Sequence, residues 1–190
     1  MRCDFETRMA GRSQHSRPKW TSAQYDPNFG PVKPKLYLET TVVSYLTARS
    51  TRDIVMTARQ QITQEWWDRR RRDFNIHVSQ LVLAEAARGD ATAAKLRLAA
   101  LREFAVLEIQ SAVPKLANAL LKSRLLPTNA ADDALHIAMA AVHGVHFLLT
   151  WNFRHIANAT RADEIRLLVA KLGHTCPVIC TPEELLHPLS

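Results

Sequence analysis

Short apolar runs alternate with helical segments along most of this chain, and this alternation constrains the fold more than any other feature. The runs that we interpret as strands lie at 36–38, 74–78, 105–109, 145–150 and 178–180. Helical patterns follow at 54–72, 79–89, 90–102, 113–121, 130–142 and 162–172, with a short helix expected after Thr181. Strands that alternate with helices favour a parallel sheet covered on both faces. The sequence therefore predicts a three-layer α/β/α fold with a central parallel sheet.

The first 34 of the 190 residues have a different composition from the rest. They are rich in Ser, Arg, Gln, Pro and Gly, show no apolar periodicity, and carry a net charge of +3. We therefore expect a flexible basic extension over residues 1–34 and one folded domain over residues 35–190. A wrongly assigned translation start would produce the same appearance.

Charge and cysteine content bear on the partners and the cellular location of the protein. The net charge of +7 favours polyanionic partners. Part of it lies in the run Arg69–Arg72, which is more often a solvated helix end than a phosphate-binding patch. The three cysteines form no closed disulfide framework. The sequence also lacks an apolar run of membrane-spanning length and the apolar core of a signal peptide, so we expect a cytoplasmic protein that makes no membrane contact.

Polar side chains follow the predicted strands where a parallel sheet places its functional crevice. Glu39 ends the first strand, Glu85 lies in the helix after the second, and Asn152 follows the strand at 145–150. Asp132 and Asp133 lie in the first turn of the helix that starts near Ala130. Because the carboxyl ends of parallel strands meet at one edge, we expect these groups to converge there.

Clustered carboxylates imply a cation, because without one they would repel each other and some would protonate. Oxygen ligands suit Mg²⁺ or Mn²⁺, and such ions promote displacement at phosphorus. Acids that face a polyanion make chemical sense when a metal ion mediates the contact. This pattern favours a metal-dependent nuclease over a passive binding protein.

Each residue also has a structural interpretation. Glu85 could be an exposed helix acid, and Asn152 could simply form a turn. Favourable interaction with the helix dipole is a sufficient reason for Asp132 and Asp133. If Asn129 is the N-cap, Asp132 takes a capping position and Asp133 becomes the better ligand candidate. A buried Glu39 without partners is harder to explain structurally, since its burial is costly.

The two histidines near these acids, His136 and His155, are more often packing or hydrogen-bonding residues than ligands. Imidazole is a poor match for Mg²⁺. We therefore do not place either histidine on the metal ion.

Four segments, taken in order, resemble the PIN-domain ribonucleases, and specifically the VapC-like toxins of type II toxin–antitoxin systems. The resemblance extends over about Lys35 to Leu186. The segments are Leu36–Thr41 (LYLETT), Ser79–Glu85 (SQLVLAE), Ala131–Ala138 (ADDALHIA) and Leu148–Asn158 (LLTWNFRHIAN).

The resemblance implies that four positions bind Mg²⁺ or Mn²⁺ and activate water for phosphodiester hydrolysis. These positions are Glu39, Glu85, Asp133 and Asn152, with the first three as metal ligands. The first is Glu where Asp is more usual, and the fourth is an amide that adds no charge. A subgroup with the sequence Leu-Glu-Thr-Thr shares both departures, so we do not interpret them as inactivation.

Other residues are candidates for supporting roles and for RNA binding. Thr40, Asp132, Thr150 and His155 are candidates for support of the acids. The candidates for holding RNA are Arg69, Arg70, Arg71, Arg72 and Arg154, and Arg161 is a further basic group. The resemblance also implies a homodimer and a cognate antitoxin protein that inserts a segment near the acids.

The leading hypothesis is therefore a metal-dependent endoribonuclease, the toxin of a type II system. Two alternatives stay open. One is a catalytically weak PIN protein that binds nucleic acid and regulates, and the other is a PIN-like DNA nuclease. Metal titration distinguishes the first alternative from the leading hypothesis, and parallel RNA and DNA cleavage assays distinguish the second.

Overall fold

The computed structural model describes residues 25–26 and 30–187, which fall into two units. The smaller unit contains a two-stranded antiparallel pair, β1 (Tyr25–Asp26) and β2 (Gly30–Pro31). The larger unit spans Lys33–Pro188. Apart from this pair and residues 32–34, the predicted extension over residues 1–34 lies outside the described residues.

The larger unit is built on a five-stranded sheet whose order is β5-β4-β3-β6-β7. Every neighbouring pair in it is parallel, which confirms the predicted sheet. In the central strand, Leu36 is in register with Ile76 on one side and with Phe147 on the other. The strands are β3 (Lys35–Leu38), β4 (Asn75–Ser79), β5 (Ala105–Leu107), β6 (Phe147–Leu149) and β7 (Val178–Cys180).

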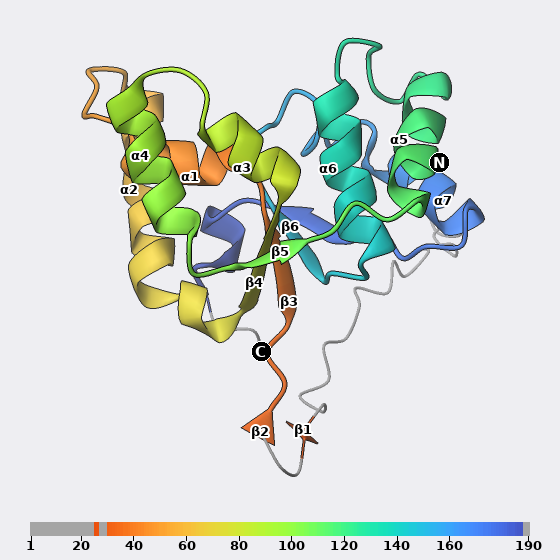
Figure 1. The fold of residues 1–190 in the computed structure, drawn as a ribbon, viewed down its shortest axis with the longest axis horizontal. Helices are drawn as coiled ribbons and strands as arrows, with labels where there is room; N and C mark the ends of the chain where they lie inside the picture. The colour runs from red at the N-terminus through yellow and green to blue at the C-terminus, as the bar shows by residue number, and fades with distance from the viewer. Residues whose placement is uncertain (1–24, 27–29, 188–190) are drawn as a thin grey trace, which may run out of the picture. The chain divides into compact units, whose positions relative to one another are not determined.

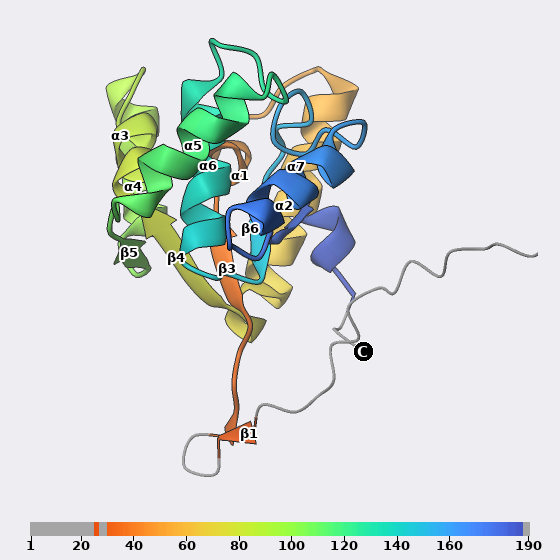
Figure 2. The same cartoon turned by 90° about the vertical axis from the view of Figure 1, so that its right-hand side faces the viewer.

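Helices cover the sheet on both faces, as Figure 1 shows. One layer contains α1 (Thr40–Thr47), α2 (Ile54–Arg69), α3 (Gln80–Ala86) and α4 (Ala91–Leu101). The other contains α5 (Ala112–Lys122), α6 (Ala131–Val142) and α7 (Ala162–Lys171), which lie in front of the sheet in Figure 2. Two 3₁₀ turns are η1 (Arg71–Asp73) and η2 (Glu183–Leu185). The three-layer α/β/α prediction is therefore confirmed.

Ser79 and Asp90 cap the starts of α3 and α4. The Ser79 hydroxyl accepts a hydrogen bond from the Val82 N–H at 3.3 Å, and Asp90 accepts one from the Ala93 N–H at 2.9 Å. Both bonds satisfy N–H groups that the first helical turn leaves unpaired. Gly89 follows the end of α3, and its φ of +85° is a left-handed conformation that glycine adopts easily. The helix predicted over 54–72 ends earlier, at Arg69, and continues as the tighter turn η1.

The core lies between the sheet and the two helix layers. Leu36, Tyr37 and Leu38 of β3 are fully buried, so both faces of the central strand are covered. Cys180 is buried in β7, and burial raises the pKa of the Cys176 thiol to about 11. Both cysteines are therefore protonated near neutral pH, in agreement with their interpretation as small hydrophobic residues. Within the described part, no helix has both the length and the apolar character needed to span a membrane.

Candidate active site

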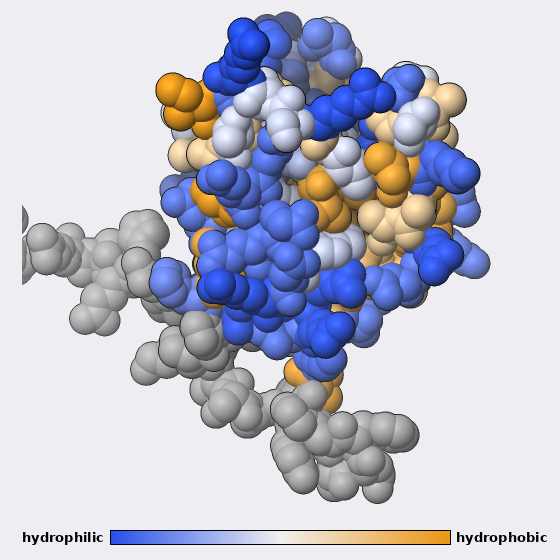
Figure 3. Space-filling view, turned by 90° about the vertical axis from the view of Figure 1, so that its left-hand side faces the viewer, coloured by the Kyte–Doolittle hydropathy of each residue, from blue (hydrophilic) through white to orange (hydrophobic). Residues whose placement is uncertain are grey.

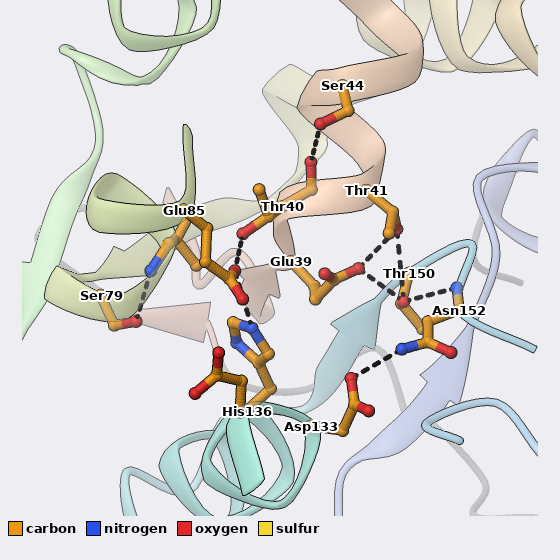
Figure 4. A network of polar contacts seen from close by, with 12 residues as sticks. Glu39, Thr40, Thr41, Ser44, Ser79, Glu85, Asp133, His136, Thr150 and Asn152 are labelled. Atoms are coloured by element: carbon orange, nitrogen blue, oxygen red, sulfur yellow. Dashed lines mark hydrogen bonds and ion pairs between the residues drawn. The ribbon is translucent and has the colours of Figure 1, made fainter. Parts of the chain in front are cut away.

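Glu39 lies where β3 passes into α1, and its side chain is only 4% exposed. Its backbone N–H donates to the Leu149 carbonyl at 3.1 Å, which fixes this turn against the end of β6. The hydroxyls of Thr41 and Thr150 both donate to the same carboxylate oxygen, Oε2, the latter at 2.7 Å. The two threonines orient Glu39 and leave its other oxygen to face the site (Figure 4).

Glu85 comes from the last turn of α3. Its Oε2 atom accepts a hydrogen bond from the Thr40 hydroxyl and lies 3.1 Å from Nε2 of His136. Burial raises the pKa of Glu85, but the hydrogen bonds from His136 and Thr40 and the positive charges of His136 and Arg88 outweigh burial and lower it. Glu85 is therefore a carboxylate near neutral pH.

His136 is buried on α6 and connects Glu85 to the core. Its Nδ1 lies 2.9 Å from the Tyr37 hydroxyl, which in turn lies 2.7 Å from the Ser79 hydroxyl. Burial lowers the pKa of His136. Its hydrogen bond to Glu85 and the charges of the nearby carboxylates raise the pKa by a larger amount, so the net shift is upward. An imidazolium in this place offsets part of the negative charge of the acids.

Glu39, Glu85 and His136 form a compact group, because one ligand atom from each lies within 4.8 Å of the others. Two carboxylates at such a separation carry more negative charge than one imidazolium offsets, so a further cation between or beside them would stabilise the group. Their oxygens are hard donors of the type that Mg²⁺ and Mn²⁺ take. The donor set therefore fits a divalent ion, with His136 as a hydrogen-bond partner of Glu85.

Asp133 faces the same space from α6, but it is held apart from that group (Figure 4). Its Oδ1 accepts a hydrogen bond from the Asn152 amide at 2.7 Å, and its Oδ2 lies 2.7 Å from Nδ1 of His155. The Asn152 oxygen accepts the His155 N–H at 3.1 Å. Asn152 thus uses both ends of its amide in orienting Asp133 and His155.

Asn129 is not the N-cap of α6, so the condition that would give Asp132 a capping position is not met. The helix begins one residue later, with Ala130 as the N-cap and no side chain in the capping role. Asp132 and Asp133 are therefore the second and third helical residues after the cap. Asp133, not Asp132, turns toward the acids, while Asp132 lies in an exposed ion pair with Arg88 at 3.7 Å.

The arginine run at 69–72 lies away from the acids. It directly precedes β4 at Asn75, at the amino edge of the sheet, whereas Glu39 follows the carboxyl end of β3. Three of its members pair with acids: Arg69 with Glu65 at 2.8 Å, Arg70 with Asp73 at 2.7 Å, and Arg71 with Glu103 at 3.1 Å. These pairs describe a solvated helix end. Arg154 is exposed, two residues after Asn152.

Of the predicted supporting residues, Thr40, Thr150 and His155 each contact a predicted acid, whereas Asp132 does not. Sequence reasoning missed Thr41 as a partner of Glu39, and Arg88 as a positive charge that helps to lower the pKa of Glu85. Closeness in sequence was the available signal, because Thr41 lies two residues after Glu39 and Arg88 lies three residues after Glu85.

Comparison with known proteins places this geometry in a family. No curated protein matches the chain. A solved structure, described as VapBC2 from Rickettsia felis bound to a DNA fragment from their promoter, is similar at 13% identity and a TM-score of 0.45, covering 77% of this chain and 97% of the other. The family model described as PIN domain matches residues 36–161, the segment that supplies every acid described above. Because this match covers more than half of the sequence, the chain belongs to the PIN domain family.

Proposed function

We propose that this protein is a metal-dependent endoribonuclease and the toxin of a type II toxin–antitoxin system. PIN domains are typically nucleases that use divalent metal ions. The observation that carries the proposal is the pairing of a buried carboxylate, Glu39, with a second carboxylate, Glu85, within 4.8 Å. Each acid has hydrogen-bond partners, but two carboxylates this close repel each other, and a bound cation would relieve that repulsion.

In this proposal Glu39, Glu85 and Asp133 hold Mg²⁺ or Mn²⁺, and Asn152 orients Asp133. The ion, when bound, supplies positive charge at the phosphate and lowers the pKa of water. The protein supplies rigid placement of the acids: Thr41 and Thr150 fix Glu39, and Thr40 with His136 fixes Glu85. Rigid placement of ligands before the substrate arrives is what makes an electrostatic site effective.

Charge supports a nucleic-acid substrate. The chain carries a net charge of +7, and Arg88 and Arg154 are exposed near the ends of the segments that bear Glu85 and Asn152. Their guanidinium groups suit phosphates, which are recognised through two parallel hydrogen bonds. The choice of RNA over DNA follows from the resemblance of the four sequence segments to VapC-like ribonucleases.

Exposed apolar side chains support a protein partner. At the start of α2, Ile54, Val55 and Met56 are 85%, 58% and 41% exposed. Hydrophobic side chains stand among hydrophilic ones on the face of the larger unit shown in Figure 3. Groups of exposed apolar residues are typical of protein interfaces. We propose a cognate antitoxin and a homodimeric state, as the resemblance implies, and a cytoplasmic location, which the cysteine content and the polar N-terminal sequence favour.

The decisive experiment measures cleavage of a structured RNA by the purified full chain with Mn²⁺, with Mg²⁺ and with EDTA. We expect cleavage with either ion and none with EDTA. Asp133→Asn and Glu39→Gln should lower the rate by more than about 100-fold, beyond the loss typical of residues that only support ligands. Asp163→Asn is the matched control, because Asp163 is an exposed acid on α7 paired with Arg166, and it should retain full activity.

Three outcomes would count against the proposal. Cleavage that survives both EDTA and Asp133→Asn rejects the metal mechanism. Retained RNA binding without Mn²⁺ binding favours the catalytically weak binding module. Cleavage of single-stranded DNA in preference to RNA favours the DNA nuclease.

The toxin role has its own test. The full chain is expressed alone in a bacterial host, and then together with the product of a small reading frame beside its gene. We expect growth arrest in the first case and relief in the second, with Asp133→Asn harmless in both. Normal growth with active wild-type protein would reject the toxin role while leaving the nuclease intact.

A further inference from the structure

One arginine near the acids lies among three aromatic rings. The guanidinium carbon of Arg59 is 5.0 Å from the ring centroid of Phe153, 5.6 Å from that of Trp151 and 5.9 Å from that of Tyr45. Arg59 also donates from Nη1 to the Tyr45 hydroxyl at 3.1 Å. We call these four residues the aromatic cluster. It joins α1, α2 and the segment after β6.

The positive charge of Arg59 is not neutralised by a neighbouring acid. Among residues 32–187, the ion pairs of the structure include Arg69, Arg70 and Arg71 but not Arg59. A guanidinium has five N–H donors, and in the same part of the chain its hydrogen bond is the one to Tyr45. Aromatic faces stabilise the cation without replacing an anion. The Arg59 guanidinium therefore has a positive charge and further N–H donors with which it can bind a phosphate.

The aromatic cluster is continuous with the acid site. Tyr45 lies one helical turn after Thr41 on α1, so the two side chains are on one face. The backbone N–H of Trp151 donates to the Thr41 hydroxyl at 2.8 Å, and that hydroxyl donates to Glu39. Phe153 directly follows Asn152, which bonds to Asp133. The aromatic cluster and the acids therefore share two direct links, one through Thr41 and one through the Asn152–Phe153 peptide.

Phe153 differs from the other rings of the aromatic cluster in its exposure. Its side chain is 44% exposed, whereas Trp151 is 5% exposed and serves the core. An exposed phenyl ring beside an arginine offers a flat apolar surface together with N–H groups that can donate hydrogen bonds to a phosphate. Single-stranded nucleic acids are bound by this combination, because every base has a π face that stacks without sequence preference.

We propose that the aromatic cluster is a nucleotide subsite, in which an unpaired base of the RNA stacks on Phe153 while Arg59 binds the adjoining phosphate. This rests on the proposed nuclease function and adds to it a preference for unpaired RNA beside the scissile bond. A purely structural role, in which Arg59 only fastens α2 to the segment after β6, would not distinguish paired from unpaired RNA.

The test measures binding of a fluorescently labelled single-stranded RNA of about a dozen nucleotides, and of the same sequence as a duplex, by anisotropy in EDTA. Phe153→Leu keeps an apolar side chain but removes the ring, and Phe153→Tyr restores the ring. We expect Phe153→Leu to weaken single-strand binding by about tenfold, the loss of one stacked base. Duplex binding should be unchanged, and Phe153→Tyr should bind like wild type.

Two further variants sharpen the result. Arg59→Lys keeps the charge but loses the planar donor pair, so it should weaken single-strand binding too. Leu167→Ala removes another exposed apolar side chain, 71% exposed on α7, and should have no effect. Thermal melting verifies that each variant folds. If Arg59→Lys does not fold, Phe153→Leu alone decides the question.

The outcomes separate this inference from the proposed function, because binding in EDTA needs no catalysis. Normal cleavage with unchanged binding by Phe153→Leu rejects the subsite and leaves the nuclease. Absent cleavage with ring-dependent binding supports the subsite and rejects the nuclease. Equal losses for single-stranded and duplex RNA reject base stacking.

Discussion

At the scale of single residues, the site depends on hydroxyl groups that hold carboxylates. Thr41 is the clearest case, because its oxygen accepts the Trp151 N–H and donates to Glu39. It therefore connects the end of β6 to the acid that follows β3. A hydroxyl in such a position contributes to the site beyond the stability of its own hydrogen bonds, because it fixes the direction of a charged group.

Replacing Thr41 tests this role. Thr41→Val keeps the shape but leaves Glu39 without one donor and Trp151 N–H without its acceptor. We expect the affinity for Mn²⁺ and the RNA cleavage rate to fall by about 10- to 100-fold, while Thr41→Ser stays near wild type. Isothermal titration and initial rates provide the measurements. Valine and serine variants that behave alike would show that the hydroxyl does not position Glu39.

The positions of the acids and of Thr40, Thr150 and His155 beside them could be predicted from the sequence, but the contacts of Thr41 could not. Glu39 and Asn152 directly follow apolar runs, and the rule for parallel sheets places such positions at one edge. The bond between Thr41 and Trp151 joins residues 110 positions apart, and no local pattern encodes it. The separation of Asp133 from the Glu39–Glu85 pair was equally hidden, because it depends on which way one carboxylate turns.

At the scale of elements, caps decide where helices begin. Asp90 was expected to start a helix, and its carboxylate does cap α4. The start of α6 was misplaced by one residue because Pro127-Thr128-Asn129 resembles a capping sequence, while the helix actually begins after Ala130. The helix α2 ends earlier than expected, at Arg69, and η1 then leads the chain into β4.

The cap at Asp90 can be measured. Asp90→Ala removes the acceptor for the Ala93 N–H, and we expect the free energy of unfolding to fall by about 1 kcal/mol. Asp90→Asn retains a side-chain oxygen and should lose much less. Urea denaturation followed by circular dichroism gives both values. A loss of the same size in both variants would attribute the effect to charge rather than to capping.

At the scale of the whole molecule, the five-stranded sheet and its two helix layers lie entirely within Lys33–Pro188. The parallel arrangement followed from the alternation of strands and helices. The strand order β5-β4-β3-β6-β7 did not, because neighbours such as β3 and β6 are chosen by packing between segments over 100 residues apart. Strand order is what brings Glu39 beside Thr150.

This division predicts that the domain folds without its first 32 residues. We expect a chain beginning at Lys33 to melt within about 3 °C of the full chain, a difference below roughly 1 kcal/mol for a domain of this size. Differential scanning calorimetry of both proteins is the measurement, and the circular dichroism spectrum is the control for fold. A fall of 10 °C or more would show that the first residues belong to the domain.

The amide at position 152 has a consequence for how the protein comes into being. An aspartate there would stand against Asp133 and repel it, so the pocket would need its ion in order to settle. Asn152 instead donates a hydrogen bond to Asp133 and accepts one from the His155 backbone. Asp133 therefore has both of its oxygens satisfied by neighbouring side chains, so this part of the pocket can fold before any cation binds.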